Sequence, residues 1–160
     1  KCVKPKGGCS LVDANGRIKG SGYNGTRNGV DNCCDVFPNY KKQMSRLTKQ
    51  IETFNDIGTD SQRSRIIPRV LRDIESLKTE HRSWSESNEI HAELNMILTT
   101  DRKDYEGGTL YVTHKPCKRC APVIASSGIK TVYYCIDGLT NDSDDSIFGD
   151  VELIQMEKRA

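Results

Sequence analysis

Three residues able to bind zinc lie close together in the second half of the chain. His91 stands two residues before Glu93, and Cys117 and Cys120 are three residues apart behind Pro116. One histidine and two cysteine thiolates supply three protein ligands, which leaves the fourth position of a tetrahedral zinc ion to water, as in catalytic zinc sites. We therefore expect His91, Cys117 and Cys120 to bind zinc and Glu93 to act as the catalytic acid and base.

The cysteine pair by itself is not specific to catalysis. C-x-x-C also occurs in structural zinc sites and redox pairs, and a single histidine in a helix is more often a surface or core residue. A catalytic site is favoured by the combination, in which a glutamate follows the histidine by two residues and a proline precedes the first cysteine. A structural zinc site does not need that glutamate.

Two helices and a strand are expected to position these residues. Asn88 can cap a helix that continues through Leu94, Ile97 and Leu98. His91 and its glutamate are about 200° apart on such a helix, so both can face one ion only at the helix's N-terminal end. The metal is therefore expected at a helix mouth.

The cysteines follow a strand-like run that ends near Thr113. Pro116 then turns the chain into a second helix, which is bounded by Gly128. This helix should begin at about residue 118 or 119, because Pro122 is tolerated only near a helix start. Both cysteines then lie in the turn and the first helical turn, where unpaired backbone N–H groups favour thiolates.

The remaining pattern predicts an α/β fold. Strand-like runs are expected at residues 9–13, 17–23, 110–113, 131–136 and 151–155. The first two form a hairpin, and a short helix follows the acidic loop at 141–145. This order predicts a mixed five-stranded sheet with helices on both faces, a three-layer α/β/α fold.

A polar stretch interrupts this pattern. Residues 41–80 show helical spacing in Met44, Leu47 and Ile51, and again in Ile67, Leu71 and Ile74. We expect one or two helices here, around a loop at 56–60. The chain is then a single domain over residues 1–160 with a helical insertion at about 36–80.

Composition indicates the class of substrate and the cellular compartment. The net charge is +2 with both signs mixed along the chain, which favours a small anionic substrate over a long nucleic acid. We find no apolar run of roughly 20 residues and no signal-peptide pattern, so we expect a soluble cytoplasmic protein. Seven cysteines, an odd number, suit metal binding in a reducing compartment. Because the chain begins at Lys1 rather than Met, we expect that N-terminal sequence is missing.

A glycine-rich segment, G-Y-N-G-T-R-N-G, follows the second expected strand. Its glycines allow a tight turn and a close approach to a ligand, although a turn alone would account for them. Asn24 has an amide that can both donate and accept hydrogen bonds, and it lies next to the expected pocket. We expect Asn24 to contact a nucleotide.

Several motifs resemble the deoxycytidylate (dCMP) deaminases, most closely the T-even phage type, within the zinc-dependent cytidine/deoxycytidylate deaminase family. The similar runs are G-Y-N-G-T, N-C-C-D, E-H-R-S, N-E-I-H-A-E-L-N, Y-V-T, P-C-x-x-C-A and S-G-I-K. H-x-E followed by P-C-x-x-C is shared by zinc nucleobase deaminases in general. The first three runs separate this chain from tRNA adenosine deaminases and nucleic-acid cytosine deaminases.

The resemblance implies hydrolytic deamination of dCMP to dUMP and ammonia, which feeds dTMP synthesis in the cytoplasm of a phage host. Water activated by zinc attacks C4 of the cytosine, and Glu93 moves protons to N3 and to the leaving amine. Ala92 and Pro116 are expected to contribute backbone contacts to the substrate. Nucleic-acid deamination of cytosine or adenosine is one alternative, although only 6% of residues are aromatic. A non-catalytic zinc- or nucleotide-binding regulator is the other.

The resemblance also implies regulation. Members of the family are homohexamers that dCTP activates and dTTP inhibits, with Mg²⁺ able to accompany the triphosphates. The residues that would bind the effector are Gly22, Tyr23, Asn24, Gly25 and Arg27. Arg102 matches a family arginine near subunit contacts, and a solvated helix end would account for it equally well.

A second, structural zinc is implied as well, giving two zinc ions per chain. Its ligand positions in the resembled family fall here on Cys2, Cys33, His81 and Glu89. The chain departs from the family pattern at Cys9, where alanine is usual, and at Arg27, where proline is usual. The family's first helix is also absent ahead of Lys1.

Overall fold

The computed structural model describes residues 7–137 and 144–157. It divides into two compact units, and the chain passes between them twice. One unit contains residues 7–25, 90–137 and 144–157, and the other contains residues 26–89. No helix in the described part of the chain is long and apolar enough to span a membrane.

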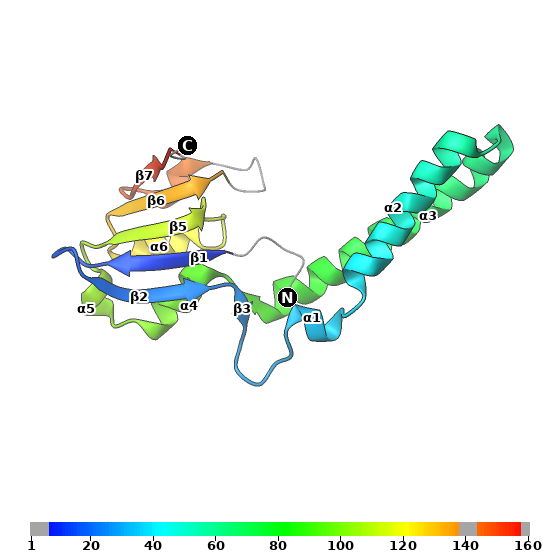
Figure 1. Cartoon of the computed structure of the whole chain (residues 1–160). Coiled ribbons are helices and arrows are strands. Elements are labelled where there is room, and N and C mark those ends of the chain that lie inside the picture. The colour runs from blue at the N-terminus through cyan, green and yellow to red at the C-terminus, as the bar shows by residue number, and fades with distance from the viewer. Residues whose placement is uncertain (1–6, 138–143, 158–160) are drawn as a thin grey trace. The chain divides into compact units, whose positions relative to one another are not determined.

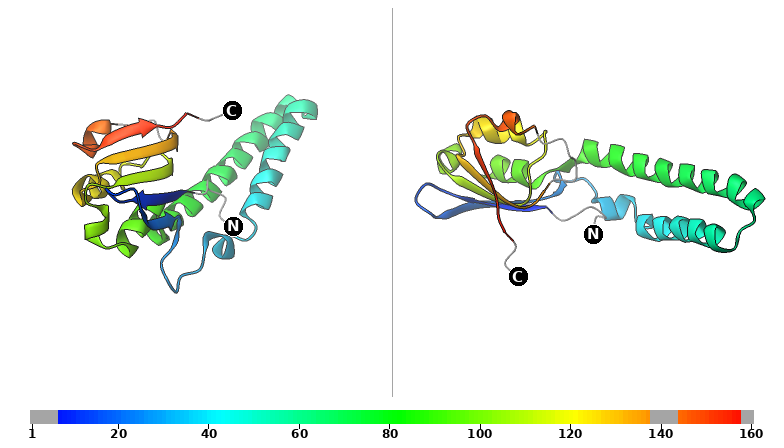
Figure 2. Two further views of the ribbon diagram at one scale, coloured as in Figure 1. Left: turned by 60° about the vertical axis from the view of Figure 1, so that its left-hand side comes forward. Right: turned by 90° about the horizontal axis from the view of Figure 1, so that it is seen from above.

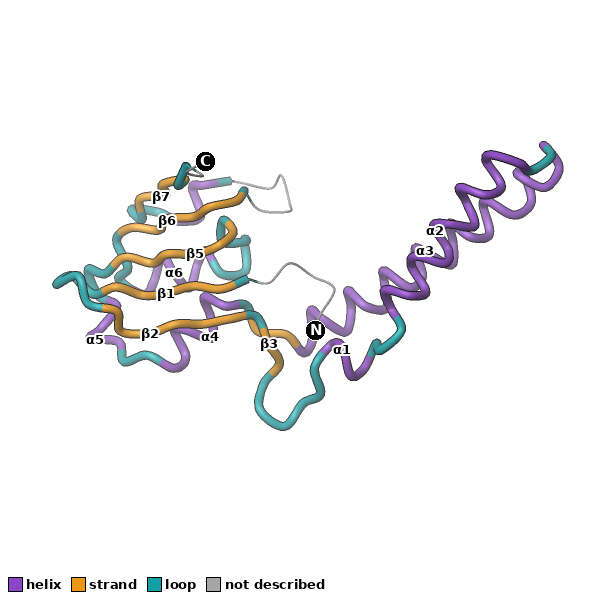
Figure 3. The backbone as a smooth tube through the Cα atoms, viewed as in Figure 1, coloured by secondary structure: helices purple, strands orange, loops and turns teal. Residues whose placement is uncertain are grey.

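The first unit is built on a five-stranded sheet, drawn in orange in Figure 3. Its strands are β1 (Gly8–Val12), β2 (Ile18–Tyr23), β5 (Thr109–His114), β6 (Thr131–Ile136) and β7 (Glu152–Gln155). They lie in the order β2-β1-β5-β6-β7, antiparallel on either side of β1 and parallel from β5 to β7. The predicted α/β class, hairpin and mixed five-stranded sheet are confirmed.

The core of this unit lies on one face of the sheet. Side chains from alternate positions on β1, β5 and β6 point toward it, and Leu11, Leu110 and Val132 among them are fully buried. The helices α4 (Ala92–Thr99) and α6 (Ala121–Ser127) pack on this face with the 3₁₀ helix η1 (Asp145–Phe148) (Figure 2, right). The start of each α-helix is therefore held against the sheet.

The opposite face of the sheet carries polar and aromatic side chains. Tyr111 and Tyr133 stack there with ring centroids 5.1 Å apart, and Tyr111 is 39% exposed. The two rings come from paired positions of the parallel strands β5 and β6. The second helical layer that the sequence predicts on this face stays a prediction.

The second unit contains the helices α1 (Cys33–Val36), α2 (Tyr40–Ile57) and α3 (Asp60–Asn88). The long helices α2 and α3 lie side by side and antiparallel (Figure 1), so the predicted helical insertion is present as two helices. Helix α3 runs to Asn88 instead of ending near residue 80. Two short strands, β3 (Gly25–Thr26) and β4 (Glu89–Ile90), pair where the chain passes between the units.

The helical hairpin is thinly packed. Helix α2 has no fully buried side chain, and in α3 the buried apolar side chains are Val70 and Ile74. Leu71, which belongs to the spacing that predicted this helix, is 51% exposed, whereas Val70, about 100° around the helix, is buried.

Two predicted helix starts were also displaced. Asn88 does not cap the zinc helix, because it is the last residue of α3, and His91 is the N-cap of α4 instead. Helix α6 begins at Ala121, with Cys120 as its N-cap, two to three residues later than predicted. Gly128 ends it as expected, with a φ of 96° that favours glycine. The predicted loop residues 141–143 lie outside the described residues.

Candidate active site

His91, Cys117 and Cys120 converge where two helices begin. His91 is the N-cap of α4, Cys120 is the N-cap of α6, and Cys117 lies in the loop before it. The His91 Nδ1 atom is 3.3 Å from Cys117 Sγ and 3.4 Å from Cys120 Sγ, and the two sulfurs are 3.9 Å apart. As the sequence predicted, the three potential ligands meet at a helix mouth.

These separations suit a tetrahedral zinc ion. Bond lengths of about 2.3 Å to sulfur and about 2.0 Å to nitrogen place neighbouring tetrahedral ligands about 3.5 to 3.8 Å apart. The observed distances of 3.3, 3.4 and 3.9 Å bracket that range without any rearrangement of the backbone. One nitrogen and two thiolates form a closely grouped donor set for zinc.

The two thiols differ in acidity because they share a proton. The hydrogen bond with Cys120 lowers the pKa of Cys117 to about 3, helped by His91 and opposed by burial. The same hydrogen bond and burial raise the pKa of Cys120, because a second negative charge would stand beside the first. The hydrogen bond with Cys117 raises the pKa of His91. A cation between the three side chains would remove this competition.

Glu93 lies beside the metal-binding group, in the first turn of α4. Its side chain is buried, with 6% of the residue exposed. Burial raises the pKa of Glu93, although its own backbone N–H and the charge of His91 act the other way. A carboxyl group that is driven toward its neutral form can hold a proton and return it, as a general acid and base must.

Comparisons with known proteins agree with this geometry. The family model of the cytidine and deoxycytidylate deaminase zinc-binding region matches residues 1–136. The chain belongs to this family. It is 39% identical to the deoxycytidylate deaminase of Enterobacteria phage T4 over 141 residues, which cover 84% of this chain and 69% of the relative. The deaminase of Mycobacterium phage D29 is 31% identical, over 83% and 80% of the two chains.

Solved structures show the same fold. The dCMP deaminase of cyanophage S-TIM5, crystallised with dCMP and dUMP, matches with a TM-score of 0.56. The match covers 98% of this chain and 85% of the other, at 23% sequence identity. The cytidine-deaminase-like arrangement that the sequence predicted is therefore confirmed at the level of the fold.

In this deaminase, the segment after β2 holds the start of α4 in place. The Asn24 Oδ1 atom accepts a hydrogen bond from the Ala92 N–H at 2.9 Å, and the Asn95 amide donates to the Tyr23 carbonyl at 2.9 Å. A Cβ atom on Gly22 would lie 2.1 Å from the Ala92 carbonyl oxygen, so only glycine allows this approach. These contacts fix the helix turn that carries Glu93.

Two of the residues predicted to bind substrate, Asn24 and Ala92, are hydrogen-bonded to each other. The Ala92 N–H, expected to hold the base, donates to Asn24 instead, so a base contact there requires Asn24 to release it. Pro116 is buried directly before the first cysteine, in the loop between β5 and α6. The roles of Asn24, Ala92 and Pro116 toward substrate stay predictions.

Sequence reasoning missed Asn95. This residue lies one helical turn after His91, on the side of α4 that meets the end of β2. Its signal was present in the motif N-E-I-H-A-E-L-N, where a polar amide interrupts an apolar helical run. A side chain that competes for backbone hydrogen bonds is unfavourable inside a helix unless it has a partner outside it.

Most of the residues expected to bind an effector are exposed, and their role in binding it stays a prediction. Tyr23 is 75% exposed, so its ring is accessible although its carbonyl is bound. Gly25 is the last residue of the first segment of the sheet unit. Arg27 is exposed and belongs to the helical unit. Arg102 is exposed at the start of the short helix α5 (Arg102–Tyr105), after the zinc helix has ended.

The second unit brings together residues expected at the second zinc. Cys33 is 2% exposed and His81 is 5% exposed, and Cys33 Sγ lies 2.8 Å from His81 Nε2. Glu89, one residue past α3, accepts a hydrogen bond from the Ser85 hydroxyl at 2.9 Å. Cys2 lies outside the described residues. A buried thiol beside a buried imidazole is the donor chemistry of a structural zinc site.

Replacing Asn95 with Ala should weaken zinc binding at the candidate active site. The His91 ligand is the N-cap of α4, and residues that orient metal ligands typically change metal affinity by about 10- to 100-fold. Competition against a chelator measures this, and amide exchange at Ala92 should rise. Leu98→Ala, at a position 73% exposed on the same helix, is the control. Unchanged zinc affinity in Asn95→Ala would contradict the proposed orienting role.

Proposed function

We propose that this chain is a dCMP deaminase that converts dCMP and water into dUMP and ammonia, supplying dUMP for dTMP synthesis in the host cytoplasm. The observation that carries the proposal is the grouping of His91, Cys117 and Cys120 beside the buried carboxyl of Glu93. It is supported by 39% identity to a phage deoxycytidylate deaminase over most of this chain.

The proposed mechanism divides the chemistry between the metal and one side chain. His91, Cys117 and Cys120 would hold a zinc ion, which would act as a Lewis acid and make water nucleophilic near neutral pH. Glu93 removes a proton from the attacking water and delivers it to ring N3 as oxygen bonds to C4. The same carboxyl then takes the remaining hydroxyl proton and passes it to the amine, which leaves as ammonia when the C4–N4 bond breaks.

Substrate choice separates this proposal from its alternatives. Incubation with dCMP, cytidine and a cytosine-containing oligonucleotide, with ammonia release as the measurement, should give rapid turnover with dCMP alone. Release from the oligonucleotide would assign the chain to the nucleic-acid deaminases. Absence of release from all three, in zinc-loaded protein, would favour a zinc- or nucleotide-binding regulator.

The finer proposals concern a second metal and regulation. We propose a structural zinc held by Cys33, His81, Glu89 and Cys2, supported by the 2.8 Å contact between the first two side chains. We also propose a homohexamer that dCTP, with Mg²⁺, activates and dTTP inhibits. The exposed Tyr23 ring, next to a backbone that contacts α4, supports an effector site at residues 22–25.

Glu93→Gln should abolish most turnover without loss of zinc. Glutamine keeps the size and hydrogen bonding of the side chain but cannot carry a proton, so kcat should fall by about 10²- to 10⁴-fold or more. Ammonia release from dCMP and metal analysis of the same preparation measure the two effects. Activity close to that of the unmodified protein would disprove the role of Glu93.

Cys33→Ala should remove one of two zinc ions. If Cys33 is a ligand of a structural site, metal analysis should fall from two zinc ions per chain toward one, and the melting temperature should drop strongly. Cys34→Ala, which changes the neighbouring, partly exposed thiol, is a matched control. A single zinc per chain in the unmodified, folded protein would disprove the second site.

Effectors should change the shape of the kinetic curve. We expect sigmoidal dependence on dCMP that becomes hyperbolic with dCTP and is suppressed by dTTP, because an effector on residues 22–25 would favour one position of α4. Tyr23→Ala should weaken both effects, since it removes the exposed ring and leaves the carbonyl that Asn95 binds. Hyperbolic kinetics unaffected by either triphosphate would show an unregulated enzyme.

A further inference from the structure

The helical hairpin carries a concentration of positive charge that the whole-chain value hides. Residues 40–72 hold eight Lys and Arg side chains and three Asp and Glu, whereas the complete chain has a net charge of +2. The expectation of evenly mixed charge was wrong for this segment. Except for Arg63, which pairs with Asp60, none of these cations forms an ion pair within the described residues.

Six of the cations form one stripe on each helix, and we call the two stripes together the basic band. Its members share a spacing of four and then three residues, so three lie on one stripe of each helix: Lys42, Arg46, Lys49, Arg65, Arg69 and Arg72. All six are exposed. Arg63 Nε donates to the Phe54 carbonyl at 3.1 Å, which sets these two positions opposite each other on the antiparallel helices. At the same rise per residue, Arg46 then lies at the level of Arg72, and Lys49 lies at the level of Arg69.

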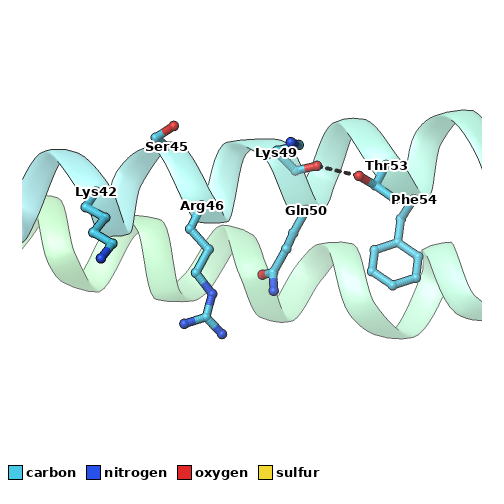
Figure 4. Close-up of a pocket in the computed structure, with 7 residues that line it drawn as sticks. All are labelled: Lys42, Ser45, Arg46, Lys49, Gln50, Thr53 and Phe54. Atoms are coloured by element: carbon cyan, nitrogen blue, oxygen red, sulfur yellow. Dashed lines mark hydrogen bonds between the residues drawn. The ribbon is translucent and has the colours of Figure 1, made fainter.

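A groove of about 490 Å³ lies along the band on α2 (Figure 4). It is lined by Lys42, Ser45, Arg46, Lys49, Gln50, Thr53 and Phe54. The cations lie toward the start of the helix and the Phe54 ring lies toward its end. Such a groove suits an apolar side chain flanked by carboxylates, which is the usual chemistry of an interface with an apolar centre and a charged rim.

The charges beyond the band favour a compact partner. Glu52 and Asp56 follow it toward the hairpin turn, and Asp73 and Glu75 follow it on α3 toward the other end. A long polyanion such as a nucleic acid, laid along the hairpin, would therefore meet like charges on both sides. A short acidic element would not.

The same chain contains an element of that kind. Residues 131–156 hold six Asp and Glu and no Lys or Arg. Asp144, Asp150 and Glu152 are exposed around η1 and at the start of β7, which is the last strand of the sheet, and we call them the acidic edge. Ile147 on η1 lies between two of these carboxylates in the sequence and is 36% exposed.

We propose that the basic band and groove of one copy bind the acidic edge of a second copy, with Ile147 entering the groove beside Phe54. The inference rests on the proposed homo-oligomer and names one of its contacts. Two basic bands repel each other, so the contact joins different surfaces of the two copies. Exposed ion pairs are individually weak, so several pairs and the apolar anchor act together.

Charge reversal on each side tests the contact. Arg46→Glu with Arg69→Glu reverses the band, and Asp150→Lys with Glu152→Lys reverses the edge. Each double variant should associate at least about tenfold more weakly than the unmodified protein, as measured by sedimentation velocity. An equal mixture of the two variants should regain the mass of the unmodified assembly, because each reversed surface then meets an opposite charge.

Controls separate this proposal from the others. Arg17→Glu with Lys78→Glu reverses two exposed cations outside the band and should leave the mass unchanged. Circular dichroism and zinc content check the folding of every variant. An oligomer that neither reversal affects would overturn the contact while leaving the proposed assembly and deaminase activity intact.

Loss of mass in both variants without recovery in the mixture would also overturn the contact, and would point to separate partners for the two surfaces. An unmodified protein that stays monomeric at high concentration would overturn the contact and the assembly together. Failure of the oligomeric protein to deaminate dCMP would instead disprove the proposed function alone.

Discussion

The site depends on holding two cysteine sulfurs 3.9 Å apart in a largely buried position. Two thiolates at that distance repel, and water is too scarce there to screen them. Two helix N-termini lie beside the sulfurs, and their partial positive charge favours the negative charge of a thiolate. This arrangement requires His91 to be the N-cap of α4 and Cys120 to be the N-cap of α6. The pKa of Cys117 is lowered chiefly by the hydrogen bond with Cys120, then by His91, and the backbone N–H groups of residues 119 and 120 add to the effect.

The position of α4 depends in turn on the end of β2. A helix start can approach a strand this closely only where the strand lacks side chains, and Gly22 faces the Ala92 carbonyl at a distance that no Cβ could occupy. The Ala92 N–H at the helix start donates to Asn24, because a buried polar group needs a hydrogen-bond partner. The G-Y-N-G segment therefore has a structural task independent of any nucleotide.

The sequence was sufficient to predict that His91, Cys117 and Cys120 come together, because zinc restricts both the kinds of ligand and their spacing. The sequence was also sufficient to locate the five strands of the sheet, because their apolar positions alternate. It could not place Asn88 correctly, since the same residue suits a cap and a helix end, and only the packing of α3 decides between them.

The length of α3 was equally hidden, because Pro68 lies inside it and proline normally ends a helix. Asn95 was missed for a different reason. The motif shows a polar amide in an apolar helical run, but it does not identify the partner, which is a backbone carbonyl 72 positions away in the sequence.

The segment after β2 contributes to both structure and chemistry through the hydrogen bond between Asn24 and the Ala92 N–H. The Ala92 N–H has a single proton to donate, and Asn24 receives it at 2.9 Å. A substrate base that bound the same N–H would displace Asn24, whose amide would then be available to the ligand. Any molecule that orders residues 22–25 acts on the same hydrogen bond, and therefore on the helix turn that carries Glu93. Effector and substrate would influence each other only as far as their affinities differ between the two arrangements of Asn24, and the coupling would be the same in both directions.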